Sequence, residues 1–150
     1  MQELYASEAH LQKKVCQYLD IVLPDFSIYH HSANEGRGNK VQFYMKLYLM
    51  GFKSGWPDLE IFVPDCKPIF LELKRPGNYA TPKQKAIHKL LEYAGTHVFI
   101  CKSLQDVYQS LVNIVPLKKH QAATNMILHE QTLEADIKKM KRLKKERAKK

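Results

Sequence analysis

The sequence predicts a mixed α/β domain in which a central β-sheet is flanked by helices. Two observations carry this prediction: segments with helical apolar stripes alternate with short runs of β-type residues, and Gly and Pro mark the boundaries between them. A length of 150 residues with 45% hydrophobic residues suits one domain with a buried core. The expected order is α-β-α-β-β-α-β-α, followed by a basic tail.

The first part of the predicted domain combines two helices with one strand. The expected elements are a helix over residues 7–22, a strand over 26–31, a turn-rich loop over 34–39 and a helix over 41–50. Ser7 provides the capping hydroxyl of the first helix, and Pro24 ends it. Gly51 closes the second helix at its C-terminal end. An apolar stripe at helical spacing marks the buried side of the first helix: Leu11, Val15, Tyr18, Leu19 and Val22.

The second part predicts a β-hairpin followed by a helix, a strand and a last helix. The expected elements are strands over 58–63 and 68–74, a helix over 82–94, a strand over 97–101 and a helix over 104–114. A short loop containing Asp65 separates the first two strands, which favours antiparallel pairing. Thr81 caps the next helix with Pro82 in its first turn, and Ser103 caps the last one. Pro116 closes the domain.

The positive charge of the chain is concentrated in its C-terminal part. The formal net charge is +9, yet residues 1–116 hold 13 Lys and Arg against 11 Asp and Glu, whereas residues 117–150 hold 11 against 4. We therefore expect a domain over 1–116 and a basic tail, helical or partly disordered, over 117–150. Such a tail can follow nucleic-acid phosphates or another anionic surface, and a merely solvated end is the alternative. Its apolar residues recur at roughly helical spacing: Met126, Ile127, Leu128, Leu133, Ile137, Met140 and Leu143.

The composition argues against several other classes of protein. No apolar run approaches the ~20 residues that a membrane-spanning helix needs, and residues 1–3 begin no signal peptide. The three cysteines, Cys16, Cys66 and Cys101, are widely spaced and include no CxxC pair. We therefore expect neither a disulfide framework nor a structural zinc site, and a reducing cytoplasm is the expected compartment.

Acidic residues and a lysine interrupt the predicted hairpin strands. Asp58 follows Pro57 at the start of the first strand, and Glu72 and Lys74 lie in the second. Since strand side chains alternate, Glu72 and Lys74 share one face. A carboxylate and an ammonium inside an apolar strand are costly unless they are paired or bound to a metal. Antiparallel pairing brings Asp58 toward the Glu72 end, so two carboxylates and a lysine are predicted to converge.

This convergence favours metal-assisted hydrolysis of a phosphodiester. Asp58, Glu72 and the Leu73 carbonyl are oxygen ligands that suit Mg²⁺ or Mn²⁺. A bound cation neutralises the developing phosphate charge and lowers the pKa of the attacking water. Lys74 then orients or deprotonates that water, or stabilises the pentavalent phosphorus centre. A purely structural Glu72–Lys74 ion pair is the alternative.

Two helical side chains are candidates to complete the site. Glu8 lies in line with the apolar stripe of the first helix, which favours a site over solvent, although a first-turn acid also complements the helix dipole. Gln84 lies three residues before Ile87 and seven before Leu91, on the inward stripe of its helix. A buried Gln there is suited to hydrogen-bond a ligand or substrate, and a Gln at the edge of the core is the alternative.

Five short motifs follow one another along the chain. They are EAHLQ at residues 8–12, HSANEG at 31–36, GWPDL at 55–59, FLELKRP at 70–76 and TPKQK at 81–85. In order and spacing they resemble the virus-type replication-repair nuclease (VRR-NUC) domain of the PD-(D/E)xK superfamily. The resemblance covers roughly residues 7–112 and implies a restriction-endonuclease-like core, a mixed central sheet flanked by helices. The basic tail has no counterpart in it.

The resemblance implies a role for each candidate residue. By this resemblance Asp58 and Glu72 are metal ligands, and Lys74 is the catalytic lysine. Glu8 is the acid of the first helix that completes the metal site. Gln84 is the glutamine of the helix that follows the catalytic strand.

Other polar residues in or near these motifs are further candidates for the site or for DNA contact. Glu35 rivals Glu8 as the completing acid, but it lies in a Gly-rich loop, where an exposed acid is the simpler interpretation. His30 and His31 are adjacent and point to opposite faces of a strand, so at most one is expected to serve. The residues expected to contact DNA are Lys40, Arg75, Lys83, Lys85, His31 and Asn34.

Stand-alone members of this family resemble Holliday-junction resolvases that act as homodimers. Symmetric cutting of a four-way junction needs two sites related by a two-fold axis. The resemblance therefore implies a Mg²⁺- or Mn²⁺-dependent DNA endonuclease acting on branched DNA, of a small phage-type or bacterial kind that works in the bacterial cytoplasm. Two alternatives stay open: a nuclease for flaps, single strands or DNA in general, and a non-catalytic nucleic-acid-binding protein whose charged core is structural.

Overall fold

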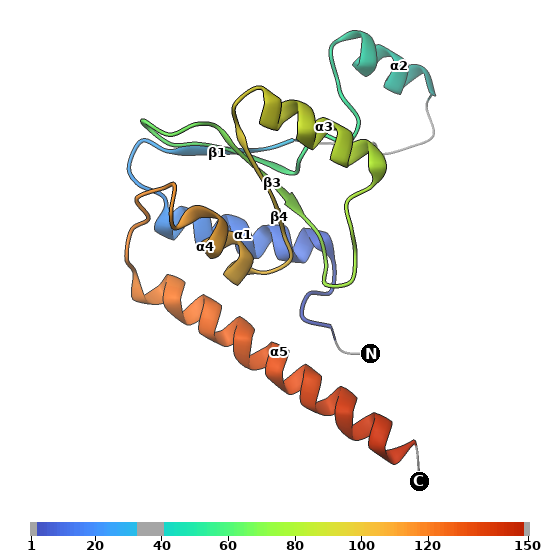
Figure 1. The fold of residues 1–150 in the computed structure, drawn as a ribbon, viewed down its shortest axis with the longest axis vertical. Coiled ribbons are helices and arrows are strands. Elements are labelled where there is room, and N and C mark those ends of the chain that lie inside the picture. The colour runs from blue at the N-terminus through green and yellow to red at the C-terminus, as the bar shows by residue number, and fades with distance from the viewer. Residues whose placement is uncertain (1–2, 33–40, 149–150) are drawn as a thin grey trace. The chain divides into compact units, whose positions relative to one another are not determined.

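Helices and strands alternate along the part of the chain that the structure, a computed structural model, describes, namely residues 3–32 and 41–148 (Figure 1). The helices are α1 (Glu8–Val22), α2 (Val41–Leu49), α3 (Pro82–Tyr93), α4 (Leu104–Leu111) and α5 (Gln121–Arg147). The strands are β1 (Ile28–His31), β2 (Leu59–Phe62), β3 (Ile69–Leu73) and β4 (His97–Cys101). The mixed α/β class, the order of the elements and a helical C-terminal segment, all predicted from the sequence, are confirmed.

The chain divides into two compact units. One consists of Met1–Asp25, Lys74–Asn78 and Cys101–Lys150, and the other of Phe26–Leu73 and Tyr79–Ile100. We call the first the helical unit, because it contains α1, α4 and α5, and the second the sheet unit, because it contains most of the sheet together with α2 and α3. The domain boundary at residue 116 stays a prediction.

The sheet is mixed and has the strand order β1-β2-β3-β4. β2 pairs antiparallel with both β1 and β3, so the predicted hairpin is confirmed. β4 runs parallel to β3, because the His97 N–H donates to the Pro68 carbonyl and, further along both segments, the Lys74 N–H donates to the Cys101 carbonyl. Because β2 and β3 are antiparallel, Asp58, just before β2, and Glu72, near the end of β3, lie at neighbouring strand ends.

The core of the sheet unit lies along β2 and β3. The paired apolar side chains of these strands have no exposed surface: Leu59, Ile61, Ile69 and Leu71. β3 is buried along its whole length, as expected of a central strand covered on both faces. α3 adds His88 and Leu91 to the core, whereas α2 buries none of its side chains.

In the helical unit, α1 presents its predicted stripe to the core. All five stripe residues are buried: Leu11, Val15, Tyr18, Leu19 and Val22. The predicted caps are also confirmed, since the Ser7 hydroxyl accepts a hydrogen bond from the His10 N–H and the Ser103 hydroxyl accepts one from the Asp106 N–H. These bonds satisfy amide groups that the first turns leave without a helical partner.

The predicted apolar stripe of the tail is correct only in part. α5 buries Ala123, Glu130 and Ile137, whereas Leu128 and Leu143 of the predicted stripe are 53% and 46% exposed. The middle one of these three buried residues is Glu130, which a pattern of apolar residues does not include. No helix among the described residues is long and apolar enough to cross a membrane.

Two element boundaries differ from the prediction by more than one residue. The first strand begins at Ile28 rather than at Phe26, because Phe26 has a φ of 64° and its side chain is 95% exposed. That left-handed backbone conformation is incompatible with strand pairing. α4 ends at Leu111, short of the predicted residue 114, and its last turn closes when the Val112 N–H donates to the Tyr108 carbonyl.

Candidate active site

Asp58 stands directly before β2 and is tied to the end of β3. Its Oδ2 accepts a hydrogen bond from the Leu73 N–H at 2.7 Å. Because Leu73 directly follows Glu72, this bond holds the Asp58 carboxylate at the backbone beside Glu72. Antiparallel pairing of β2 and β3 therefore brings the two acids to neighbouring strand ends, as the sequence predicted.

Glu72 is fully buried, and its carboxylate is held by α3. Oε1 accepts a hydrogen bond of 2.6 Å from Gln84 Nε2, and Oε2 lies 3.4 Å from His88 Nε2. Gln84 and His88 are four residues apart, so they lie on the same face of the helix. Since an isolated buried carboxylate is strongly disfavoured, these contacts explain how Glu72 is accommodated inside β3.

The orientation of the Gln84 amide is fixed by the cap of α3. Its Oε1 accepts the Thr81 N–H at 2.8 Å, and the Thr81 hydroxyl accepts the Gln84 N–H at 3.2 Å, which is a capping box. With the oxygen turned toward Thr81, the amide nitrogen is left to donate to Glu72. The structure therefore places Gln84 beside Glu72, and the predicted cap of α3 is confirmed.

The loop before Asp58 packs against the same end of α3. Gly55 has a φ of +89°, and a Cβ atom at this position would meet backbone atoms of Lys83 and Gln84 at 3.2–3.3 Å. Trp56 donates to Glu60 Oε1 at 2.6 Å, and its ring meets the Phe70 ring edge-on at 5.8 Å. The GWPD motif thus requires glycine for the close approach and tryptophan for the anchor that sets the start of β2.

β1 adds polar groups beside Asp58. His31 Nδ1 lies 3.0 Å from the Asp58 carbonyl oxygen, and the Ser32 N–H donates to the same oxygen at 3.1 Å. The Ser32 hydroxyl donates to Glu60 Oε1 at 3.0 Å. Of the two adjacent histidines, His31 is therefore the one beside Asp58. Three further candidates, Asn34, Glu35 and Lys40, lie outside the described residues.

In the helical unit, the predicted lysine and first-helix acid lie close together. Lys74 is 8% exposed, and its Nζ lies 3.8 Å from Glu8 Oε2. Asn78 Nδ2 donates to the other oxygen of Glu8 at 3.3 Å. The side chain of Arg75 is engaged within the protein, because it pairs with Glu3 and donates to the Ala6 carbonyl. The predicted DNA contact of Arg75 therefore competes with these bonds.

The oxygen groups at the neighbouring ends of β2 and β3 are of the type that hard divalent cations prefer. They are the oxygen atoms of Asp58, Glu72 and the Leu73 carbonyl. Among the described residues, no group of three or more His, Cys, Asp or Glu side chains is arranged to hold a metal. Mg²⁺ is commonly held by one or two carboxylates with water completing its shell, and a carboxylate accepts several partners at once. The chemistry of these oxygen groups thus suits such a cation, while both carboxylate oxygens of Glu72 face Gln84 and His88.

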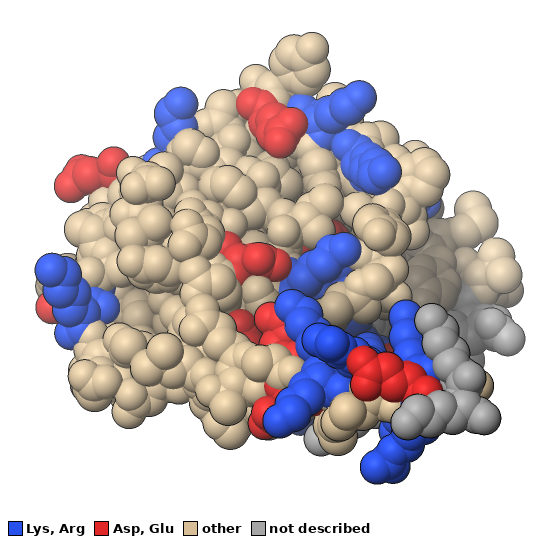
Figure 2. Space-filling view, turned by 60° about the horizontal axis from the view of Figure 1, so that its bottom comes forward, with Lys and Arg blue, Asp and Glu red and all other residues tan. Residues whose placement is uncertain are grey.

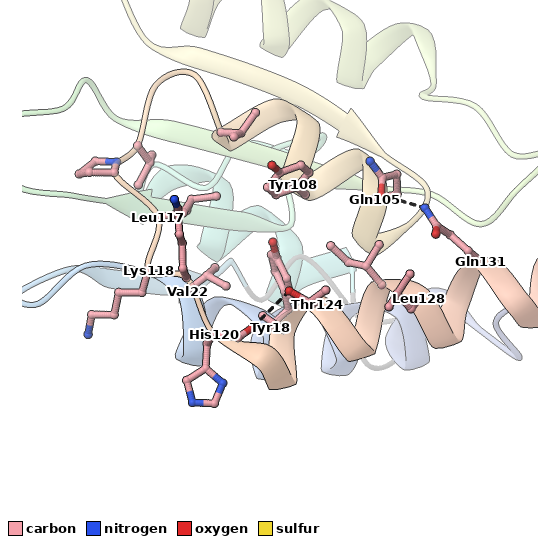
Figure 3. A pocket seen from close by; sticks show the side chains of 16 residues that line it. Tyr18, Val22, Gln105, Tyr108, Leu117, Lys118, His120, Thr124, Leu128 and Gln131 are labelled. Atoms are coloured by element: carbon pink, nitrogen blue, oxygen red, sulfur yellow. Dashed lines mark hydrogen bonds between the residues drawn. The ribbon is translucent and has the colours of Figure 1, made fainter.

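A separate cavity of about 690 Å³ lies in the helical unit (Figure 3). Its walls come from α1, α4, α5 and the segment between α4 and α5, with Tyr18, Tyr108 and Leu128 among the lining residues. Burial raises the pKa of Tyr18 to about 12, so its hydroxyl stays protonated near neutral pH. None of the predicted catalytic residues lines this cavity.

The fold was compared with those of known proteins. No protein-family model matches the chain, and no curated protein matches it either. A solved structure described as "VRR_NUC domain protein" matches with a TM-score of 0.54 at 23% sequence identity, covering 71% of this chain and 86% of that one. This chain has the fold of a VRR_NUC domain.

The VRR_NUC fold agrees with the resemblance that the five motifs indicated. A second solved structure, described as "VRR_NUC domain", covers 71% of this chain and 94% of its own at 22% identity, with a TM-score of 0.47. Within this fold, sequence reasoning missed His88, although its spacing of four residues from Gln84 was an available signal. It also missed Ser32 and Glu60, which no spacing rule connects to Asp58.

Proposed function

We propose that this chain is a divalent-metal-dependent DNA endonuclease of the VRR-NUC family that hydrolyses phosphodiester bonds in branched DNA, in the manner of a Holliday-junction resolvase. The observation that carries the proposal is the fully buried Glu72 carboxylate, held by Gln84 and His88 beside the Asp58 carboxylate. Burying an acid costs stability unless the acid is paired and hydrogen-bonded. Gln84 and His88 accommodate the charge, and a metal-binding role explains why an acid is present in this buried strand at all.

Asp58, Glu72 and the Leu73 carbonyl are the proposed ligands of Mg²⁺ or Mn²⁺, and Glu8 is the acid proposed to complete the set. When bound, the cation supplies charge neutralisation at the phosphate and a more acidic water. Gln84 donates a hydrogen bond to one carboxylate oxygen of Glu72 and so fixes the plane of the carboxylate. The direction of the second oxygen is then fixed as well. His88 lies 3.4 Å from that second oxygen.

Lys74 is proposed to act on the attacking water and on the phosphate. It is two residues beyond Glu72 in the chain, and its ammonium lies 3.8 Å from Glu8 Oε2. An ammonium held in place by this contact is suited to orient water and to stabilise negative charge at phosphorus. This contact supports the orienting role among those open to Lys74.

DNA is the proposed partner, and a homodimer is the proposed assembly. Exposed lysines on the first turn of α3, Lys83 and Lys85, and His31 beside Asp58 are suited to contact phosphates. Lys40, Asn34 and Arg75 are proposed to add to them. Two copies related by a two-fold axis would present two sites to a symmetric junction. The reducing cytoplasm is the proposed compartment.

The chemistry is tested with a labelled four-way junction, Mg²⁺ or Mn²⁺, and the variants Asp58→Asn and Glu72→Gln. We expect each variant to lower the cleavage rate by about 100-fold or more, since losing even a residue that only supports a metal ligand costs about 10–100-fold. Glu92→Gln, on an exposed position of α3, is the matched control and should cut normally. Wild-type rates in both variants would refute the assignment.

The substrate is tested separately with a panel of DNA structures. We expect the junction to be cut faster than linear duplex of the same sequence, with paired nicks in opposite strands by a protein that sediments as a dimer. Equal rates on linear duplex would remove the claim of branched DNA and leave a general nuclease. Binding without cleavage under every metal condition would favour a non-catalytic DNA-binding protein.

A further inference from the structure

α2 is an apolar helix on the surface of the sheet unit. None of its side chains is buried, and its large apolar residues are mostly exposed, including Phe43 at 49%, Tyr48 at 66% and Leu49 at 81%. Contiguous apolar surface of this kind marks a site of interaction. Because the hydrophobic effect disfavours exposed apolar side chains, we expect another molecule to bind this surface of α2.

One side of α2 forms a groove with the loop that follows it and with the first turn of α3. The groove has a volume of about 520 Å³. Its walls carry three aromatic rings, from Tyr44, Tyr48 and Phe52, and two ammonium groups, from Lys53 and Lys83. Lys53 Nζ lies 5.4 Å from the centre of the Tyr48 ring. Aromatic faces interleaved with cations are the combination that binds unpaired nucleotides, because bases stack on rings and phosphates meet lysines.

The groove is joined to the proposed catalytic residues through α3. Lys83 lines the groove, and the next residue, Gln84, donates to Glu72. Gly55 packs its backbone against Lys83 and Gln84, so the loop that carries Lys53 is seated on the same helical turn. A strand lying in the groove would therefore have its backbone beside the first turn of α3, the turn that fixes the Glu72 carboxylate.

We propose that this groove binds an unpaired nucleotide of the DNA substrate, with the base stacked on Tyr48 and the flanking phosphates on Lys53 and Lys83. The inference rests on the proposed function and narrows its substrate class. A paired base is already stacked within the duplex and reaches the groove only after extrusion. Branch points, flaps and single strands offer unpaired bases at no such cost, so the groove selects them over continuous duplex.

A second copy of this chain is the competing occupant, and the lysines argue against it. In a two-fold symmetric interface the same surface meets itself. Lys53 and Lys83 of one copy would then approach those of the other, and like charges brought together at an interface are unfavourable. Polyanionic DNA neutralises the same lysines, so charge complementarity favours the nucleic acid.

The test measures binding of single-stranded DNA that contains the fluorescent base 2-aminopurine, with EDTA present to exclude metal-dependent cleavage. Stacking on Tyr48 should quench the fluorescence of the wild-type complex. Tyr48→Ala should abolish the quenching and weaken binding by about fivefold or more, the effect expected of one lost base stack. Tyr48→Phe should retain both. Tyr93→Ala removes a 91% exposed tyrosine outside the groove and should change neither.

Lys53→Ala tests the electrostatic half of the proposal. It should make the slope of log K against log salt concentration shallower by about 0.7 for each lost phosphate contact, and the quenching of 2-aminopurine should remain. Lys89→Ala, on an exposed position of α3 outside the groove, is the control and should not change the slope. An unchanged slope in Lys53→Ala would overturn the assignment of phosphates to this lysine.

The groove and the nuclease activity fail in distinguishable ways. Wild-type protein that quenches 2-aminopurine through Tyr48 but cuts no DNA would support the groove and refute the nuclease. Junction cleavage with unquenched fluorescence and an unchanged affinity in Tyr48→Ala would overturn the groove and leave the nuclease standing. If Tyr48→Ala instead turned a dimer into a monomer with no effect on quenching, the occupant would be a second copy and the proposal would be wrong.

Discussion

Glu72 shows how a single buried charge organises its surroundings. Its two carboxylate oxygens face Gln84 and His88 on one side of α3, and the residue after it holds Asp58 through a backbone amide. Each contact restricts the carboxylate to one orientation, which is the preorganisation that a metal ligand requires. Because Gln84 and His88 accommodate this buried carboxylate, conservative changes at either should lower the free energy of unfolding, and they should also weaken the proposed metal binding.

Cys101 provides a test at the residue scale. It has no exposed surface, and burial raises the pKa of its thiol to about 12. Because only the thiolate reacts readily, a disulfide reagent at pH 8 should leave Cys101 unmodified in the folded protein and modify it after denaturation. The Cys101 carbonyl accepts the Lys74 N–H, so protection of this thiol also reports that the segment bearing Lys74 is in place.

The matched comparison for Cys101 is its rate of modification against those of Cys16 and Cys66, which are half-buried. Peptide mapping after a timed reaction separates the three. Modification of Cys101 as fast as the other two, under conditions where the protein is folded, would contradict the burial on which this prediction depends.

Some site residues were predictable from the sequence, and others were not. Asp58 and Glu72 stand out because a charge in an apolar strand needs a reason. Gln84 follows from its helical spacing. The contact of His88 with Glu72 depends on how α3 packs on β3, and the contact of Ser32 with Glu60 depends on the register of β1 and β2. Those are properties of the packed structure, which a local pattern does not contain.

At the scale of elements, Glu130 shows how α5 is attached within the helical unit. Its carboxylate accepts the Leu104 N–H at 2.7 Å and the Gln105 N–H at 3.2 Å, and the Tyr5 hydroxyl donates to it as well. Glu130 therefore caps the N-terminus of α4 from another helix, where a negative charge also complements the helix dipole. Burial and this carboxylate together raise the pKa of Tyr5 above its ordinary value.

Glu130→Ala should destabilise the protein by about 2–4 kcal/mol, because it leaves buried donors without an acceptor. The free energy of unfolding is measured by urea denaturation at constant m-value. Glu146→Ala removes another α5 carboxylate, whose ion pair with Arg142 is exposed, and should change stability by less than about 0.5 kcal/mol. Equal effects of the two substitutions would show that Glu130 does not attach α5.

The elements themselves were predicted better than the way they pack. Helices and strands follow from spacing, caps and turn residues, which are local signals. The attachment of α5 was not predicted, because it depends on a buried glutamate that satisfies the amides of a different helix. The exposure of α2 was not predicted either, since an apolar sequence ordinarily indicates burial.

At the scale of the whole chain, the basic residues of α5 lie in a different segment of the helix from its buried residues. Ile137 is the last buried residue of the helix, and the helical residues after it are predominantly basic: Lys138, Lys139, Lys141, Arg142, Lys144, Lys145 and Arg147. Figure 2 shows Lys and Arg side chains gathered on one part of this face, with Asp and Glu side chains among and beside them. Four of them border one surface hollow together with Glu146. This basic segment is suited to phosphates and is not needed for the core.

Truncation after Ile137 should therefore separate binding from chemistry. The truncated protein loses the basic segment but keeps Ala123, Glu130 and Ile137, so it should fold. Its affinity for DNA should fall, and the slope of log K against log salt should become shallower by about 0.9 for each lost phosphate contact with duplex DNA. The metal requirement for cleavage should not change.

A variant with Lys→Gln at 138, 141 and 145 keeps the helix and should show part of the same loss. An unchanged slope in the truncated protein would mean that the segment is merely solvated, whereas loss of folding would mean that α5 is held by more than its buried residues.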